Sequence, residues 1–209
     1  MTDKILWYFA DPMCSWCWGF SHVIHEVKKT FDDKVKIALV LGGLRPGTTD
    51  PMSDASREEI LHHWHEVEKM SGASFNFNNA LPEQFIYDTE PASRAVITAA
   101  TLQADILLAY FSAVQSAFYV EQKDVTRISV LATIAAEQFK LDKDEFIKAF
   151  ESEAMRQKTQ QHFALARKAG VRGFPSLILQ KEEQQMINIT NGYQAGDKIV
   201  ARLNAELED

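Results

Sequence analysis

The hydrophobic pattern at the start of the chain alternates between strand and helix. Apolar runs at Lys4–Ala10 and at Val35–Leu41, the second rich in branched residues, are typical of buried strands. Between them, apolar residues recur at alternating steps of three and four, which predicts a helix with one buried stripe made of Cys17, Phe20, Ile24, Val27 and Phe31. We therefore predict a strand–helix–strand unit over the first part of the chain.

The middle of the chain, from about Pro51 to Ala169, has helical spacing almost throughout. Its apolar faces are typical of packed helices and include Ile60, Trp64 and Val67; Leu107, Phe111, Val114 and Phe118; and Ile128, Ala132, Ala135 and Phe139. Capping signals divide this stretch. We expect helix starts at Ser56 with Glu59, at Pro91 and at Asp142 with Glu145, a break near Ser152, and C-terminal glycines at Gly72 and Gly170.

Strand character returns near the end of the chain. Ser176–Gln180 and Ile187–Thr190 flank a charged turn at Lys181–Gln185, which predicts a β-hairpin followed by a short terminal helix. Phe174-Pro175 precedes the hairpin. A proline that opens a strand is tolerated, and its peptide bond is able to adopt the rare cis form.

Composition and charge narrow the class of function. The 209 residues suffice for one large domain or two small ones, and the formal charge of −7 gives no basic surface for nucleic acid or anionic membranes. The apolar run Ile5–Ala10 is too short for an export signal, and no stretch approaches the roughly 20 apolar residues that span a bilayer. We therefore expect a cytoplasmic protein that acts on small molecules or on other proteins.

The chain contains two cysteines, Cys14 and Cys17, separated by two residues. A protein with no other thiols has no disulfide scaffold to build, so we interpret the pair as a reversible dithiol/disulfide couple. Cys14 falls at the predicted helix start, where free backbone N–H groups and the helix dipole stabilise a thiolate, whereas Cys17 lies on the buried stripe. We therefore predict that Cys14 attacks a disulfide and that Cys17 resolves the mixed disulfide.

Two metal-binding interpretations are weaker because of their ligand spacing. His22 and His25 lie too close together on one helix to surround a zinc ion with the cysteines. The segment His62-His63-Trp64-His65-Glu66 has side chains at helical neighbour spacing, but no third ligand is evident elsewhere in the sequence. We expect no metal site, and we expect Trp64 to be a buried anchor flanked by solvated histidines.

These features combine into a resemblance to the DsbA family that covers essentially the full chain. It rests on Cys14-Ser15-Trp16-Cys17 after a strand, on the helical block after the second strand, and on Val171–Pro175 before a hairpin. The segment Asp11–Phe20 is most similar to cytoplasmic family members of the protein-disulfide isomerase type. The resemblance implies an α/β, thioredoxin-like fold with an inserted all-helical domain. We place the thioredoxin-like domain at residues 1–49 and 170–209 and the helical domain at residues 50–169.

The resemblance also implies roles for residues outside the two cysteines. The family proline that matches Pro175 is cis and faces the cysteine pair. The residue that matches Phe174 offers its backbone to an extended substrate strand, which would pair with it as a β-strand does. Trp16, Trp18 and Phe174 are candidates for an apolar substrate rim, although each of them fits a packing role as well.

Three positions near the motif have open roles. Arg45, in the loop Gly42–Gly47, either faces the thiolate or is simply solvated. Tyr8 stands six residues before the first cysteine, where thioredoxin and several relatives carry a buried carboxylate, so the usual proton relay is missing. Asp11 either caps the helix or moves protons. The dipeptide Ser15-Trp16 does not fix the direction of electron flow, because about 30 mV corresponds to only about 1.4 kcal/mol for this couple.

The sequence therefore predicts a thiol–disulfide oxidoreductase or protein-disulfide isomerase that acts on disulfide-containing proteins or small thiols. It requires no bound cofactor, and glutathione is a candidate redox co-substrate. One alternative is a glutathione-dependent isomerase or transferase similar to the kappa-class and 2-hydroxychromene-2-carboxylate isomerase branch, which typically has serine at the position of Cys14. The other is a peptide-binding, chaperone-like module whose dithiol senses oxidation. The oligomeric state stays open.

Overall fold

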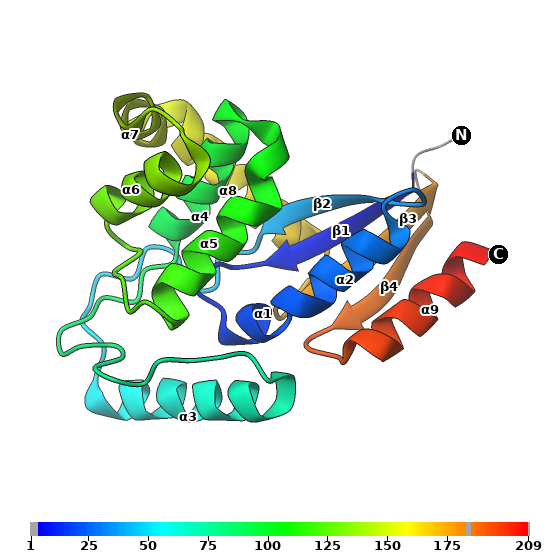
Figure 1. The fold of residues 1–209 in the computed structure, drawn as a ribbon, viewed down its shortest axis with the longest axis horizontal. Coiled ribbons are helices and arrows are strands. Elements are labelled where there is room, and N and C mark those ends of the chain that lie inside the picture. The colour runs from blue at the N-terminus through cyan, green and yellow to red at the C-terminus, as the bar shows by residue number, and fades with distance from the viewer. Residues whose placement is uncertain (1–3, 183–184, 209) are drawn as a thin grey trace.

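A mixed β-sheet lies at the centre of the computed structural model, which describes residues 4–182 and 185–208. Within those residues, the strands follow the order β2-β1-β3-β4 (Figure 1). They are β1 (Ile5–Ala10), β2 (Lys36–Leu41), β3 (Ser176–Glu182) and β4 (Gln185–Asn191). β1 pairs in parallel with β2 and antiparallel with β3, and β3 pairs antiparallel with β4.

Helices connect the strands and cover both faces of the sheet. α1 (Ser15–Gly19) and α2 (Ser21–Phe31) join β1 to β2, and α9 (Gly196–Glu208) follows β4. The long segment between β2 and β3 contains α3 (Asp54–Ser71), α4 (Glu90–Leu102), the 3-10 helix η1 (Ala104–Ile106), α5 (Leu107–Tyr119), α6 (Ile128–Phe139), α7 (Lys143–Glu151) and α8 (Glu153–Lys168). In Figure 1, α2 and α9 lie on the near face of the sheet, and α8 lies behind it.

The apolar core runs without interruption from the sheet into the helices. One large cluster of buried side chains extends from Leu6 on β1 to Phe146 on α7. A second, small cluster of Phe9, Val40 and Ala166 lies between the sheet and α8. The sequence assigns α8 to the helical domain, yet α8 packs against β2 of the sheet. The division into two domains therefore stays a prediction.

Most predicted element boundaries agree with the structure. The stripe of the first helix is buried at every position, although the helix is interrupted at Phe20, between α1 and α2. Gly72 and Gly170 adopt positive φ after α3 and α8, and the side chains of Asp142 and Ser152 cap α7 and α8. Both strands of the hairpin are confirmed, while positions 183 and 184 of its predicted turn lie outside the described residues.

The start of α3 corrects one prediction. The helix begins at Asp54, and its N-cap is Ser53, whose side chain accepts a hydrogen bond from the Ser56 N–H at 3.2 Å. Ser56 therefore occupies the third helical position and is not the cap. The sequence places the cap one turn too late because both serines carry a suitable hydroxyl, and spacing alone does not choose between them.

Ser53→Ala is expected to lower the free energy of unfolding by about 1 kcal/mol, because the Ser56 N–H loses its acceptor. Urea unfolding of the variant and the parent measures the loss. Ser56→Ala is the matched control, since it removes a hydroxyl from the same turn and leaves the cap in place, and it should cost clearly less. Equal losses for the two variants would contradict the assignment of Ser53.

A histidine on α8 accepts a hydrogen bond from the outer edge of β2. β2 is the outermost strand on its side of the sheet, so the sheet provides no partner on that edge. The Leu41 N–H donates to Nδ1 of His162 at 3.3 Å. Burial lowers the pKa of His162 to about 4, and the nearby Lys158 contributes in the same direction. His162 is therefore neutral at pH 7, which is the state that accepts the hydrogen bond.

The free energy of unfolding is expected to fall as the pH drops from about 6.5 to about 4, because the unfolded histidine binds a proton in this window and the folded one does not. The pKa of His162 is lowered in the folded protein, so the stability that its neutral form contributes is present above this pH window and is lost below it. His162→Gln, which cannot titrate, should lose about 1–3 kcal/mol less across the window than the parent. Urea unfolding at several pH values tests this, and parallel pH profiles would contradict it.

Candidate active site

A tight turn connects the end of β1 to the first cysteine. Asp11, Pro12 and Met13 follow β1, and the Cys14 N–H donates to the Asp11 carbonyl at 3.1 Å. Cys14 is the N-cap residue of α1, with an extended backbone at φ −92° and ψ 116°. The predicted position of Cys14 at a helix start is therefore confirmed.

Both cysteines are buried, but they differ in the surface that they keep exposed. Cys14 keeps 6% of its surface exposed, whereas Cys17 is fully buried one turn further along, and both are free thiols. Burial raises the pKa of the Cys17 thiol well above its ordinary value, and hydrogen bonding and charge at the neighbouring Cys14 raise it further. Cys17 is therefore held as a protonated thiol, and of the two residues only Cys14 keeps any exposed surface.

The segment that opens β3 lies against this sulfur. The Cys14 Sγ–H donates to the carbonyl oxygen of Phe174 at 3.6 Å, and the Phe174–Pro175 peptide bond is cis. The antiparallel register of β1 and β3 pairs Phe9 with Ser176, which brings the residues before β3 next to the turn that follows β1. The pairing of the strands thus places Phe174 beside Cys14, although the two residues are 160 positions apart in the sequence.

Gly42 allows the Phe174 ring to lie over the end of β2. A Cβ at position 42 would overlap the ring atoms of Phe174, and Gly43 beside it has φ +69° with the Phe163 ring against it. The Phe174 ring also packs against the small cluster beneath α8. The ring of Phe174 therefore has a packing contact, while its backbone carbonyl faces Cys14.

The two tryptophans of the motif have different surroundings. The half-buried Trp16 ring lies 5.5 Å from the ring of Tyr193, which follows β4, so the two aromatics form one surface beside the cysteines. Trp18 donates from Nε1 to the Ser74 carbonyl at 2.9 Å and stacks on Tyr119. These contacts favour packing for Trp18 and a rim for Trp16. Sequence reasoning missed Tyr193, because a lone tyrosine in a loop gives no signal.

Arg45 lies near the site without touching the cysteines in the described contacts. Its guanidinium carbon is 5.5 Å from the centre of the Tyr87 ring, and its backbone N–H donates to the Thr89 hydroxyl at 3.0 Å. The Tyr87 hydroxyl in turn donates to the Met13 carbonyl at 2.5 Å. A role for Arg45 toward the thiolate stays a prediction, whereas Tyr87 is a support of the cysteine turn that the sequence did not indicate.

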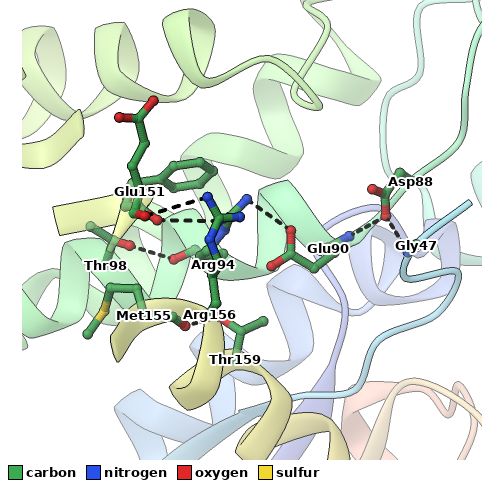
Figure 2. A network of polar contacts seen from close by, with 10 residues as sticks. Gly47, Asp88, Glu90, Arg94, Thr98, Glu151, Met155, Arg156 and Thr159 are labelled. Carbon is green, nitrogen blue, oxygen red and sulfur yellow. Dashed lines mark hydrogen bonds and ion pairs between the residues drawn. The ribbon is translucent and has the colours of Figure 1, made fainter. Parts of the chain in front are cut away.

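A polar network continues from this loop into the helices (Figure 2). The Asp88 carboxylate accepts from the N–H groups of Gly47 and Glu90, at 2.8 and 3.0 Å. Glu90 forms an ion pair with the buried Arg94 at 3.1 Å, and Arg94 also donates to the Phe150 carbonyl. Figure 2 shows these contacts in one line from the loop after β2 to α4 and the end of α7. The loop beside the cysteines is therefore anchored to the helical segment.

Asp11 is fully buried and joins the cysteine turn to the same loop. One carboxylate oxygen accepts from the Met13 N–H at 2.9 Å, and the other accepts from the Leu44 N–H at 2.7 Å. Burial raises the pKa of Asp11 to about 6, although both hydrogen bonds act in the opposite direction. Asp11 thus braces the turn and leaves the N–H groups of α1 uncapped by its side chain.

The third open position, Tyr8, also has defined surroundings. Tyr8 is fully buried on β1, and its hydroxyl forms no hydrogen bond within residues 4–182 and 185–208. Burial and then the charges of the two cysteines raise the pKa of Tyr8 well above its ordinary value.

The histidine-rich segment lies on α3. Trp64 is buried as predicted, and His62 pairs with Glu66 at 3.5 Å on the surface of the helix. The described part of the chain contains no cluster of three metal-binding side chains.

Fold and site together define a class of protein. A mixed sheet carries a short helix whose N-cap cysteine keeps 6% of its surface exposed, and a second cysteine is fully buried one turn later. The first cysteine contacts the carbonyl of the residue before a cis proline, and that proline directly precedes β3. A nucleophilic thiol paired with a second thiol is the chemistry of disulfide exchange. The arrangement is that of a thiol–disulfide oxidoreductase with a thioredoxin-like fold.

Comparisons with known proteins lead to the same class. A family model described as thioredoxin matches residues 7–197, so the chain belongs to the thioredoxin family. None of the curated proteins compared matches the chain.

Several solved structures are similar over nearly the whole chain. One, described as a "putative protein disulfide isomerase" from Nitrosomonas europaea, is 36% identical with a TM-score of 0.92, and the match covers 99% of this chain and 98% of that one. The cytosolic disulfide reductase DsbM from Pseudomonas aeruginosa, with GSH, is 23% identical with a TM-score of 0.80, covering 98% and 100%. BdbD from Bacillus subtilis is 13% identical with a TM-score of 0.64, covering 99% and 88%. The predicted DsbA-like resemblance and fold are confirmed.

Gly42→Ala is expected to slow turnover of a disulfide substrate by roughly 10- to 100-fold, because the new Cβ must displace the Phe174 ring and with it the carbonyl beside Cys14. Gly173→Ala is the matched control, since a Cβ there meets open space. Steady-state turnover with a model disulfide measures both, and urea unfolding verifies that each variant is folded. Equal turnover in the two variants would contradict the proposed importance of the Phe174 position.

Proposed function

We propose that the protein exchanges disulfides with protein or small-thiol substrates, with Cys14 as the attacking sulfur and Cys17 as the resolving one. The observation that carries this assignment is the difference in burial between the two thiols. An attacking sulfur must reach the substrate, whereas a resolving sulfur needs only to reach its neighbour in the same motif.

The first step is attack of the Cys14 thiolate on one sulfur of the substrate disulfide. A Cys14–substrate bond forms, the substrate disulfide breaks, and the second substrate sulfur leaves as a thiolate. The backbone N–H groups at the start of α1 lie next to Cys14 and favour negative charge there. The substrate gains the electron pair in this step.

The second step is attack of Cys17 on the Cys14 sulfur. Cys17 loses its proton, the Cys14–Cys17 disulfide forms, and the first substrate sulfur leaves as a thiol. The protein is now oxidised by two electrons and the substrate is reduced by two. We propose that two molecules of glutathione then return the pair to the dithiol and are themselves oxidised to glutathione disulfide.

The substrate is proposed to be an extended peptide or small disulfide that lies along the Phe174 segment. Backbone pairing beside Phe174 would hold it, and the Trp16–Tyr193 surface with the exposed Leu44 would contact its apolar side chains. The names of two similar structures, a protein disulfide isomerase and a cytosolic disulfide reductase with GSH, support this substrate class and the use of glutathione.

We propose a cytoplasmic location and a reducing or isomerising direction. Among the helices of the described residues, none has the length and apolar character needed to cross a membrane. The reducing poise of the cytoplasm and the cytosolic reductase among the similar structures support this direction. The two retained sulfurs favour redox chemistry over the isomerase or transferase alternative, whose members typically have serine at the first position.

Cys17→Ser is expected to accumulate a mixed disulfide on Cys14 when the protein is mixed with glutathione disulfide, because the resolving thiol is missing. Cys14→Ser should form no adduct and lose turnover by at least about 1000-fold, since the buried Cys17 cannot replace the nucleophile. Intact-mass spectrometry and a glutathione-coupled turnover assay measure the two effects. Full turnover in Cys14→Ser, or an adduct on Cys17, would contradict the assignment.

A further inference from the structure

Three successive carbonyl groups before β3 have three different partners. The Gly173 carbonyl accepts a hydrogen bond from the Ser176 hydroxyl at 2.8 Å. The Pro175 carbonyl accepts one from the Gly192 N–H, also at 2.8 Å. Between them, the Phe174 carbonyl lies 3.6 Å from the sulfur of the first cysteine. The hairpin therefore holds the carbonyls on both sides of Phe174, while the middle carbonyl faces the cysteine.

The groups that hold this segment lie at one end of the hairpin. Ser176 is the first residue of β3 and keeps only 2% of its surface exposed. Its hydroxyl also lies 3.2 Å from Oδ1 of Asn191, its partner in the register of β3 and β4. Asn191 ends β4, and the next residue, Gly192, has φ +102°, a conformation that glycine adopts without a side-chain clash. The segment is thus held by a side chain and by the backbone of the same hairpin.

The Ser176 hydroxyl matters because Gly173 has no side chain of its own to fix this turn. A Cβ at position 173 would meet open space, so packing does not restrain the backbone there. The orientation of the peptide group between Gly173 and Phe174 therefore depends on the hydrogen bond that its carbonyl accepts from Ser176. Without that donor, a permissive glycine backbone precedes Phe174 directly.

We propose that Ser176 is a positioning residue for peptide substrates. Its hydroxyl fixes the Gly173 carbonyl and thereby keeps the Phe174 backbone aligned with Cys14 for pairing with an extended chain. The inference rests on the proposed function, in which a substrate lies along the Phe174 segment. A small disulfide needs only the Cys14 sulfur and does not use this alignment. Ser176 therefore favours peptide disulfides over small ones without touching either substrate.

Two substrates with the same reacting bond test this role. One is a linear peptide whose single cysteine carries thionitrobenzoate as a mixed disulfide, and the other is N-acetylcysteine amide with the same group. Cys14 attacks the cysteine sulfur of either substrate, a Cys14–substrate disulfide forms, the original S–S bond breaks, and thionitrobenzoate leaves as a coloured thiolate with the electron pair. Stopped-flow absorbance with the reduced protein gives a second-order rate constant for each substrate. We expect the parent to react about 10-fold faster with the peptide.

Ser176→Ala should lower the rate constant for the peptide by about 10-fold and leave that for the small substrate within about twofold of the parent. Asn191→Ala, at an exposed position, should lower the peptide rate constant by about threefold, because the Ser176 hydroxyl keeps its contact with Gly173. Thr190→Val is the matched control, since it removes a neighbouring buried hydroxyl that binds the Gly192 carbonyl and none of the three carbonyls before β3. It should leave both rate constants within about twofold.

Urea unfolding verifies that each variant is folded, and Asn191→Ala alone decides the test if Ser176→Ala does not fold. Equal slowing with both substrates would assign the hydroxyl a purely structural role and overturn the proposal. A parent without a preference for the peptide would also overturn it, as would an unchanged preference in the folded variants. A parent that releases no thiolate from either substrate would instead reject the proposed function itself.

Discussion

The contact between the Cys14 sulfur and the Phe174 carbonyl depends on the pairing of β1 with β3, and the rest of the site depends on that contact. The turn after β1 provides the sulfur, and the segment before β3 provides the surface on which we propose that a substrate lies. Gly42, which directly follows β2, completes the arrangement because only a glycine leaves room for the Phe174 ring. Three strands of one sheet therefore set the relative positions of Cys14, Phe174 and Gly42.

The helical segment supports this geometry from the opposite side. Tyr87 binds the Met13 carbonyl, and Asp88 and Thr89 bind the loop after β2 that Asp11 also contacts. The Glu90–Arg94 pair then connects this segment to the end of α7. The insertion is therefore joined to the cysteine turn by hydrogen bonds as well as by the continuous core, and the site belongs to both parts of the chain.

The sequence predicts those features that depend on neighbours along the chain. The stripe from Cys17 to Phe31, the helix-ending glycines and the cap at Asp142 all follow from local spacing, and all are observed. The remaining features depend on contacts between distant segments. Nothing in the spacing around Tyr193 indicates that it meets Trp16, and nothing around Asp11 indicates that its carboxylate reaches Leu44. Even the local cap of α3 is predicted at the wrong serine, because spacing alone does not choose between Ser53 and Ser56.

The proposed chemistry requires that a reagent reach the Cys14 sulfur while Cys17 stays enclosed. Alkylation of the reduced, folded protein with iodoacetamide, followed by peptide mass mapping over time, tests it directly. We expect rapid labelling of Cys14 and no labelling of Cys17 until the protein is unfolded by urea. Labelling of Cys17 in the folded protein at a rate comparable to that of Cys14 would contradict it.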